Sequence, residues 1–491
     1  MKSKVLFYIG IGLVLFSSAC KKALDLKMQG VYTSDNYFRN EVDAVTAVNG
    51  IYSILEEEDY IGHAESTFDT PSDDYWRSGD HGEDEAIENL TYDASNAAIR
   101  YPYKWRYEEI NRSTNCIINI PKITSISANI KNRCMGEAYF LRAFGYWRLM
   151  VIHGDVPIIT EDDYTKQTFN VPKSPIEEVR KQIESDLKQA VNLLPESYGP
   201  ADRGRVSKGT ALGLLTKLYM YWEKFPEAIA TGQQVVSNSH YALAANYQDN
   251  FTRANESSTE LLFSIQAVQN VVQNDFTVYY IPRAWGGYGF SQPLQGLADE
   301  FEAGDPRKQA TLLSVGDKVD LGDGKGLTTF TADLSATGYA FKKYAVFNTE
   351  ADGGGVDHSF AVPLMRSADI YLLVAEALIR TKGAGAGDAL INQIRHRASA
   401  SLKPVTNAGM KELIHERRVE LAGEDQRHQD LMRWDKAKIV DIAAIYNLPV
   451  SKAPLDKSKT VTFIRPKNYY FPLPQVEIDK SKGVLKQNPN F

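Results

Sequence analysis

The chain has 491 residues, of which 43% are hydrophobic, so it is long enough to bury a large core or to form two or three average domains. Its formal net charge is -7 at pH 7, which argues against a nucleic-acid partner, because such proteins use clustered basic residues to displace counterions. The 27 tyrosines, 20 phenylalanines and six tryptophans provide rings for a core and for a binding surface.

The first twenty residues are typical of a bacterial export signal. A basic start precedes the apolar stretch from Val5 to Phe16, which is followed by Ser17-Ser18-Ala19-Cys20. Export signals have an apolar core of about 7–15 residues and small residues at the cleavage site, whereas a spanning helix needs about 20 apolar residues. We therefore predict a lipoprotein signal peptide over residues 1–19, a lipid on Cys20 and a tether over residues 20–38. Ordinary cleavage that leaves a free thiol is the alternative.

Apolar residues then recur at helical spacing in segments that form four antiparallel pairs. The two helices of the first pair start at Val42 and after Pro102. The other three pairs cover residues 135–149 with 175–194, 211–222 with 228–236, and 368–379 with 389–398. In the third pair, small residues at Ala211 and Ala228 and a four-residue turn are typical of a tetratricopeptide hairpin. These patterns predict a mainly α fold with four tetratricopeptide-like helix pairs, long irregular loop inserts and a few short strands.

Long inserts separate the helix pairs, so we expect them to interrupt the stack. The largest insert, residues 241–363, contains glycine-rich turns and a strand-like run at 260–265. Long inserts of this kind in compact proteins are usually functional. We expect a single domain over residues 39–491, with its helical scaffold mainly at 39–240 and 364–440 and an irregular ligand-binding insert mainly at 241–363.

Two groups of residues have alternative structural interpretations. Cys116 and Cys134 lie in apolar helical patterns, which favours two buried free thiols over a disulfide. Asp317, Asp320 and Asp323 recur in a glycine-rich loop, but their spacing departs from the calcium-loop pattern, which favours a solvated turn over a metal site. We therefore expect neither a metal nor a cofactor.

The charged runs late in the chain are interpreted as structural. We expect Arg417 to pair with Glu420 along a helix surface, and Asp430 to pair with Arg433 in the same way, because residues three apart are neighbours on a helix. Alternating charge on a helix is ordinarily a solvated or ion-paired face.

No local motif identifies an active site. His415 has no second histidine at the helical spacing of a zinc protease, and neither a Gly-x-Ser-x-Gly elbow nor a phosphate-binding glycine loop is present. A glycosidase needs two carboxyl groups set across the scissile bond, which the adjacent Asp73 and Asp74 do not provide. We expect no catalytic residue, although a carboxyl pair assembled from distant positions is the alternative.

Two loop segments combine rings, carboxylates and guanidinium groups, one at residues 73–77 and one at residues 279–288. A sugar ring packs its C–H face on an aromatic face, and its hydroxyls hydrogen-bond to carboxylate, amide or guanidinium groups. For each ring a place in the core is the alternative. The candidate ligand-binding residues are Asp73, Asp74, Tyr75, Trp76, Arg77, Tyr280, Trp285 and Tyr288.

An ordered series of motifs resembles the SusD/RagB family of Bacteroidetes surface lipoproteins over nearly the whole chain. The motifs are the lipid-cysteine segment at 20–26, the runs at 136–143, 154–157 and 204–206, the late motifs at 375–377, 391–395, 416–421 and 430–434, and the closing segments at 469–474 and 487–491.

The resemblance implies a SusD-like fold and a non-catalytic lipoprotein, exposed on the cell surface of the outer membrane, which captures oligosaccharides and delivers them to a SusC-like TonB-dependent transporter. Two alternatives stay open at this point. One is a RagB-like uptake component that captures peptides, and the other is a surface glycoside hydrolase.

Overall fold

The computed structural model describes residues 37–57, 60, 68–77, 79, 81–252, 257–267, 276–345, 347, 356, 359, 361–446 and 461–491. The predicted signal peptide, Cys20 and nearly all of the tether lie outside the described residues. Among the described residues, no helix combines the length and the apolar character needed to cross a bilayer.

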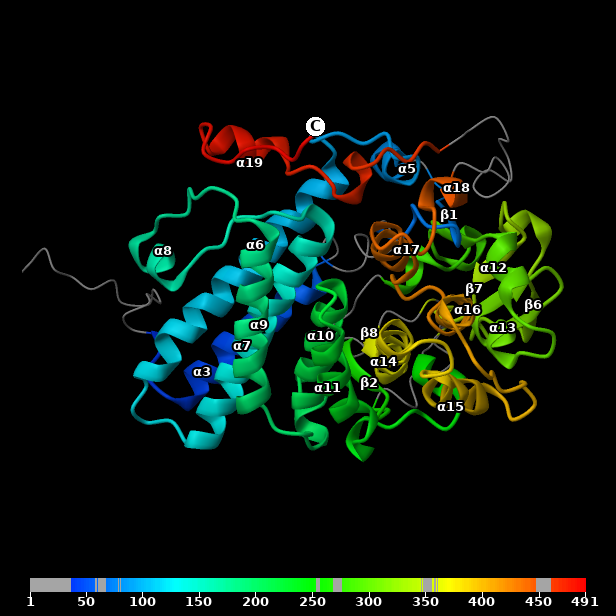
Figure 1. The fold of residues 1–491 in the computed structure, drawn as a ribbon, viewed down its shortest axis with the longest axis horizontal. Coiled ribbons are helices and arrows are strands. Elements are labelled where there is room, and N and C mark those ends of the chain that lie inside the picture. Colours follow the sequence, from blue (N-terminus) through cyan, green and yellow to red (C-terminus); the bar gives the residue numbers. More distant parts are fainter. Residues whose placement is uncertain are drawn as a thin grey trace, which may run out of the picture.

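α-Helices dominate the regular secondary structure of the described residues (Figure 1). They are α3 (Glu41–Tyr52), α5 (Gly82–Glu88), α6 (Ala97–Asn119), α7 (Ala128–His153), α8 (Glu161–Lys166), α9 (Ile176–Leu193), α10 (Lys208–Tyr221), α11 (Phe225–Val236), α12 (Gln295–Glu300), α13 (Pro306–Thr311), α14 (Ser367–Lys382), α15 (Asp388–Ala398), α16 (Met410–Glu420), α17 (Arg427–Lys436), α18 (Ile442–Tyr446) and α19 (Gln475–Lys480).

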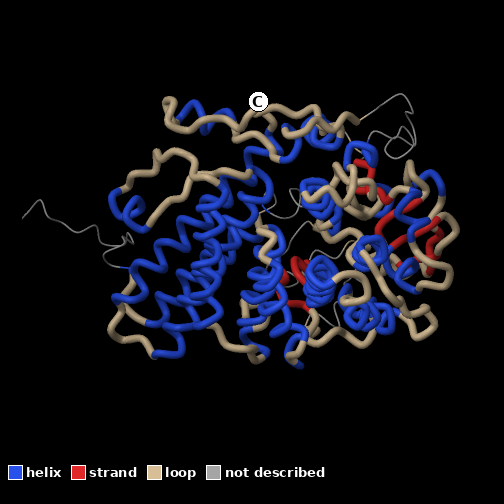
Figure 2. The backbone as a smooth tube through the Cα atoms, in the orientation of Figure 1, coloured by secondary structure: helices blue, strands red, loops and turns tan. Residues whose placement is uncertain are grey.

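The strands are short and form antiparallel two-stranded sheets in the half of the molecule away from α3 and α7 (Figure 2). The pairs are β1 (Tyr75–Arg77) with β3 (Ser291–Pro293), β2 (Leu261–Ile265) with β8 (Val362–Arg366), β4 (Leu312–Ser314) with β7 (Tyr339–Phe341), and β5 (Lys318–Asp320) with β6 (Leu327–Thr329). The prediction of a mainly helical fold with a few short strands is confirmed.

The helix pairs stack on one another, which differs from the expected interruption by inserts. Helix α7 packs on α9, α9 on α10, α10 on α11, and α11 on α14, although the largest insert separates α11 from α14 in sequence. Gly232 of α11 allows this contact, because a Cβ at that position would lie 2.3 Å from Cγ2 of Val374 in α14. The insert therefore leaves the stack and returns to it without breaking it.

The second helix of the first pair starts earlier than predicted. Helix α6 begins at Ala97, so Pro102 lies inside the helix and not before it. Ile99 and Tyr103 are both buried one turn apart, so the apolar face already exists upstream of the proline. This burial outweighs the backbone hydrogen bond that a proline removes.

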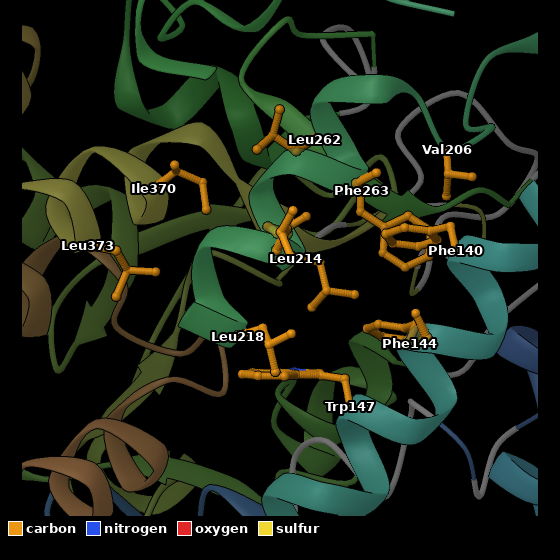
Figure 3. Close-up of a cluster of buried hydrophobic side chains, with 14 of the residues drawn as sticks. Phe140, Phe144, Trp147, Val206, Leu214, Leu218, Leu262, Phe263, Ile370 and Leu373 are labelled. Atoms are coloured by element: carbon orange, nitrogen blue, oxygen red, sulfur yellow. The ribbon is translucent and has the colours of Figure 1, made fainter. Parts of the chain in front are cut away.

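The main core joins the scaffold to the insert (Figure 3). Phe140 and Phe144 of α7 face β2, where the ring of Phe263 lies 5.3 Å and 5.2 Å from theirs in edge-on contacts. Such edge-on pairs add to the free energy gained by burying the rings. Strand β2 is thereby fixed to the helix stack.

The late charged run is buried, so the expected surface pair was wrong. Arg417 and Glu420 expose only 2% and 0% of their area. Arg417 donates to Asp369 at 2.8 Å and to Asp430 at 2.7 Å, and the expected partner Glu420 faces other arginines. The predicted Asp430–Arg433 pair is present at 2.9 Å, but it is buried as well and does not lie on the surface. Buried charges require such pairing because desolvation is costly.

Cys116 and Cys134 are free and buried, as the apolar pattern indicated. Burial raises the pKa of the Cys134 thiol to about 11, so the thiol stays protonated and weakly nucleophilic at neutral pH.

Asp317 precedes β5, Asp320 is the last residue of β5, and Asp323 lies in the turn between β5 and β6. Asp317, Asp320 and Asp323 each accept a hydrogen bond from a nearby backbone amide, at 2.8, 2.9 and 3.0 Å. Within the described residues, no group of three or more histidine, cysteine or acidic side chains is arranged to hold a metal ion.

Candidate functional site

Strand pairing orients the first candidate segment. In β1, Tyr75 pairs with Pro293, Trp76 with Gln292 and Arg77 with Ser291 of β3. Successive side chains of a strand point to opposite faces, so Tyr75 and Arg77 face inward while Trp76 faces the other way and is only half-buried. Trp76 is therefore the ring of this segment that stays accessible.

The face that Trp76 shares carries fixed polar groups. Gln292, which pairs with Trp76, accepts hydrogen bonds at Oε1 from the Ser335 hydroxyl and the Ala336 amide, both at 2.9 Å. These bonds tie β3 to the turn that leads into β7. The indole therefore lies on a braced surface and not on a free loop.

The other residues of this segment are engaged internally. Tyr75 is 3% exposed, and its ring lies 5.1 Å from Phe341. Arg77 pairs with Asp84 and lies 3.9 Å from the centre of the Phe290 ring. Desolvation lowers the pKa of Arg77 despite the nearby acids. These two side chains support the loop and have little surface for a ligand.

Asp73 and Asp74 are held by two arginines from the C-terminal helices. Arg427 Nε donates to Asp73 at 2.7 Å, and Arg418 donates to Asp74 at 2.7 Å and to Asp73 at 3.0 Å. Burial opposes ionisation, but the charges of Arg427 and Arg418 hold the pKa of Asp73 below its usual range. For Asp74 burial dominates and raises the pKa. The pair therefore fastens the loop that carries Trp76 to α16 and α17.

The second segment divides in a similar way. Tyr280 and Trp285 are 5% and 8% exposed, and Trp285 packs edge-on against Phe330 at 5.7 Å. Tyr288 is 44% exposed and rests on Phe290 at a ring distance of 5.3 Å. Replacing Trp285 would remove core packing as well as any ligand contact, so Trp76 and Tyr288 are the informative positions.

Sequence reasoning missed the arginines and the histidine that brace this region. Arg418 also donates to Glu300 at 3.0 Å, and His415 contacts Glu300 at 2.6 Å and Glu302 at 3.2 Å. This cluster joins the end of α12 to α16. The charged run at 416–421 was the only sequence feature that pointed to this cluster. It did not reveal the partners, which lie more than 100 residues away.

The His415 cluster predicts a pH dependence of stability. Hydrogen bonding to Glu300, opposed by burial, raises the pKa of His415, and the nearby Glu302 and Glu416 act in the same direction as Glu300. A raised pKa in the folded state gives stability that is complete below the unfolded value, about 6.5 for histidine, and that is lost as pH rises through the folded value.

We therefore expect the free energy of unfolding to fall more between about pH 6 and about pH 8 in the wild type than in His415→Gln. Urea titrations of both proteins at the two pH values measure this difference. An equal fall in the free energy of unfolding in the two proteins would contradict the prediction.

Rigid helices that carry recognition groups on braced loops are the arrangement of a ligand-binding protein. The SusD family model matches residues 221–491, and a second model, described as starch-binding and associating with the outer membrane, matches residues 30–220. The chain therefore belongs to the SusD family, which confirms the resemblance seen in its motifs. Glycan-binding proteins of this family are non-catalytic, in agreement with the expected absence of an enzyme activity.

Curated relatives cover most of the chain. SusD-like protein P25 of Formosa agariphila is 25% identical over an alignment of 466 residues that covers 86% of this chain and 88% of that protein. The starch-binding protein SusD of Bacteroides thetaiotaomicron is 25% identical over an alignment of 371 residues that covers 62% of this chain and 64% of that protein.

Solved structures share the fold. A laminarin-binding SusD-like protein has a TM-score of 0.77 at 26% identity, covering 92% of this chain and 100% of its own. Surface glycan-binding protein A of Bacteroides thetaiotaomicron in complex with laminarihexaose has a TM-score of 0.75 at 21% identity, covering 91% of this chain and 99% of its own. The predicted SusD-like fold is confirmed.

Proposed function

We propose that this protein is a cell-surface lipoprotein, anchored to the outer membrane through Cys20, that captures oligosaccharides without cleaving them. It delivers them to a SusC-like TonB-dependent transporter. Membership of the SusD family and the export pattern of the first twenty residues support this proposal. The signal peptide over 1–19, the tether over 20–38 and the single domain over 39–491 are parts of it.

The observation that carries the proposal is the exposure of Trp76 and Tyr288 on braced loops. A half-buried indole and a phenol ring that is 44% exposed offer flat apolar faces with polar edges. The β1–β3 pair and the Asp73 ion pairs hold the loop before a ligand arrives, which reduces the entropy lost on binding. The remaining candidate residues, Asp73, Asp74, Tyr75, Arg77, Tyr280 and Trp285, act mainly as support in this proposal.

A β-glucan is the first ligand to test, since a relative of 26% identity is a laminarin-binding protein. The transporter would contact the helical flank, because stacked helix pairs present extended docking faces.

The test uses the mature lipoprotein in detergent, titrated calorimetrically with laminarin, other soluble glycans and a peptide pool. We expect heat from a glycan, no heat from the peptides and no shortened products after long incubation. Heat from peptides alone would support the RagB-like alternative, and product release would support a hydrolase. Co-purification with a SusC-like transporter tests the partner.

A further inference from the structure

A second groove lies on the scaffold, and it shares no lining residue with the Trp76 region. It has a volume of about 470 Å³ and is bounded by α6, by the segment at residues 157–171 that contains α8, and by α19 with the residues up to Leu485. In Figure 1 these elements gather at the end of the molecule opposite α12 and α13. Ligand pockets commonly measure about 300–1,000 Å³, so the groove is large enough for a ligand. We call it the α6 groove.

One face of α6 forms the floor. Tyr103, Tyr107 and Asn111 stand four residues apart and therefore lie on the same side of the helix. The Tyr107 hydroxyl donates to the carbonyl of Pro157 at 2.8 Å, and the rings of Tyr103 and Tyr107 lie 4.9 Å apart. The floor is thus an ordered aromatic surface.

The amide of Asn111 is the chemical feature that points to a ligand. Its Oδ1 is buried and has no hydrogen-bond partner. A buried acceptor without a donor costs about 1–3 kcal/mol, so a donor from outside the chain would be favourable. Asn111 lines the groove, so a turn of its side-chain amide toward the groove would let a ligand hydroxyl supply such a donor.

The rim adds an exposed ring and a second set of polar groups. Phe169 is 48% exposed, and its ring lies 6.0 Å from that of Tyr164 in an edge-on arrangement. On the opposite wall, Lys480 pairs with Glu477 at 2.8 Å. Asn170 donates to the carbonyl of Ser481 at 3.1 Å, which links the two walls.

We propose that the α6 groove is a second contact site for the same polysaccharide that binds at Trp76. A sugar ring packs on Phe169, one of its hydroxyls donates to Asn111 Oδ1, and other hydroxyls bond to Glu477 and Lys480. An exposed ring beside amide, carboxylate and ammonium groups matches the amphipathic surface of a pyranose better than it matches a purely apolar or a charged ligand. The inference rests on the proposed function and extends it from one glycan contact site to two.

The experiment compares retention in native gels that contain laminarin. Proteins tested are the wild type, Trp76→Ala, Phe169→Ala, Asn111→Ala and Trp76→Ala combined with Phe169→Ala. We expect Phe169→Ala to weaken apparent affinity roughly threefold to tenfold and Asn111→Ala to weaken it as well. The residual retention of Trp76→Ala should vanish in the double variant. Tyr101→Ala is the control, because Tyr101 is an exposed ring on α6 outside the groove.

The outcomes separate this inference from the proposed function. If the wild type binds neither laminarin nor any other glycan, both fail. If Trp76→Ala alone weakens binding, while Phe169→Ala and Asn111→Ala behave like the wild type, the α6 groove is not a glycan site and the proposed function stands. The inference is also overturned if Trp76→Ala abolishes retention completely. It is overturned as well if Phe169→Ala loses co-purification with the transporter but keeps its retention by the glycan.

Discussion

Replacing Arg366 with methionine is expected to lower the free energy of unfolding by about 3–5 kcal/mol. Arg366 is 1% exposed, and its guanidinium contacts Glu260, Glu420 at 3.0 Å and Glu424 at 2.7 Å. Burial opposes the ionisation of Glu420, but the surrounding arginines, Arg366 among them, lower its pKa to about 2. Without Arg366, three buried carboxylates lose a shared cation that water cannot replace.

The measurement is the urea midpoint at an unchanged slope, since the slope reports the surface exposed on unfolding. Arg112→Met is the control, because the side chain of Arg112 is 40% exposed and loses a pair with Glu108 at 2.9 Å and a hydrogen bond to the Gly50 carbonyl at 2.6 Å. Exposed pairs of this kind contribute about 0–1 kcal/mol. If the two variants lost similar stability, the buried network around Arg366 would not be a main contributor.

The second large effect is on binding. We expect Trp76→Ala to weaken glycan affinity by about 2 kcal/mol, or roughly thirtyfold, because a central aromatic contact commonly carries that share of an interface. Stability should change little, since the indole is half-buried on a surface strand and contributes less to the core than Tyr75 on the opposite face. Calorimetric titration and a thermal unfolding scan measure the two quantities separately.

Trp222→Ala is the control for this prediction. Trp222 is also half-buried, but it lies at the end of α10, where its indole donates to Glu177 at 2.8 Å. The glycan affinity of Trp222→Ala should match that of the wild type. Tyr288→Ala should weaken binding as Trp76→Ala does, and wild-type affinity in both variants would remove this site from the proposal.

Local sequence patterns were sufficient for most of the long helices. Periodic apolar residues identified the segments of α7, α9, α10, α11, α14 and α15, because the turn of an α-helix sets that spacing within a few residues. The same patterns misplaced the start of α6 at Pro102. Proline is rare inside a helix, but the apolar face of α6 continues upstream of Pro102, and the helix begins at Ala97.

Local patterns did not determine which charges pair. Arg417 was expected to pair with its neighbour in the helix, Glu420, but it contacts Asp369, which lies 48 residues away. Arg418 and Arg427 contact Asp73 and Asp74 across more than 340 residues. Pairing in a buried region follows which segments the fold brings together, and the spacing within one helix contains no information about the other segment.

By itself, the sequence determined the helical class, the family and the pattern of an export signal, since each depends on residue type and near-neighbour spacing. Only the tertiary structure decided which rings remain accessible. Trp76 stays partly accessible and Tyr75 is buried because β1 pairs with β3, more than 200 residues away, and Trp285 is buried because Phe330 and Phe347 cover it. The physical reason is that exposure depends on contacts between distant segments, whereas helix formation depends mainly on residues within one or two turns.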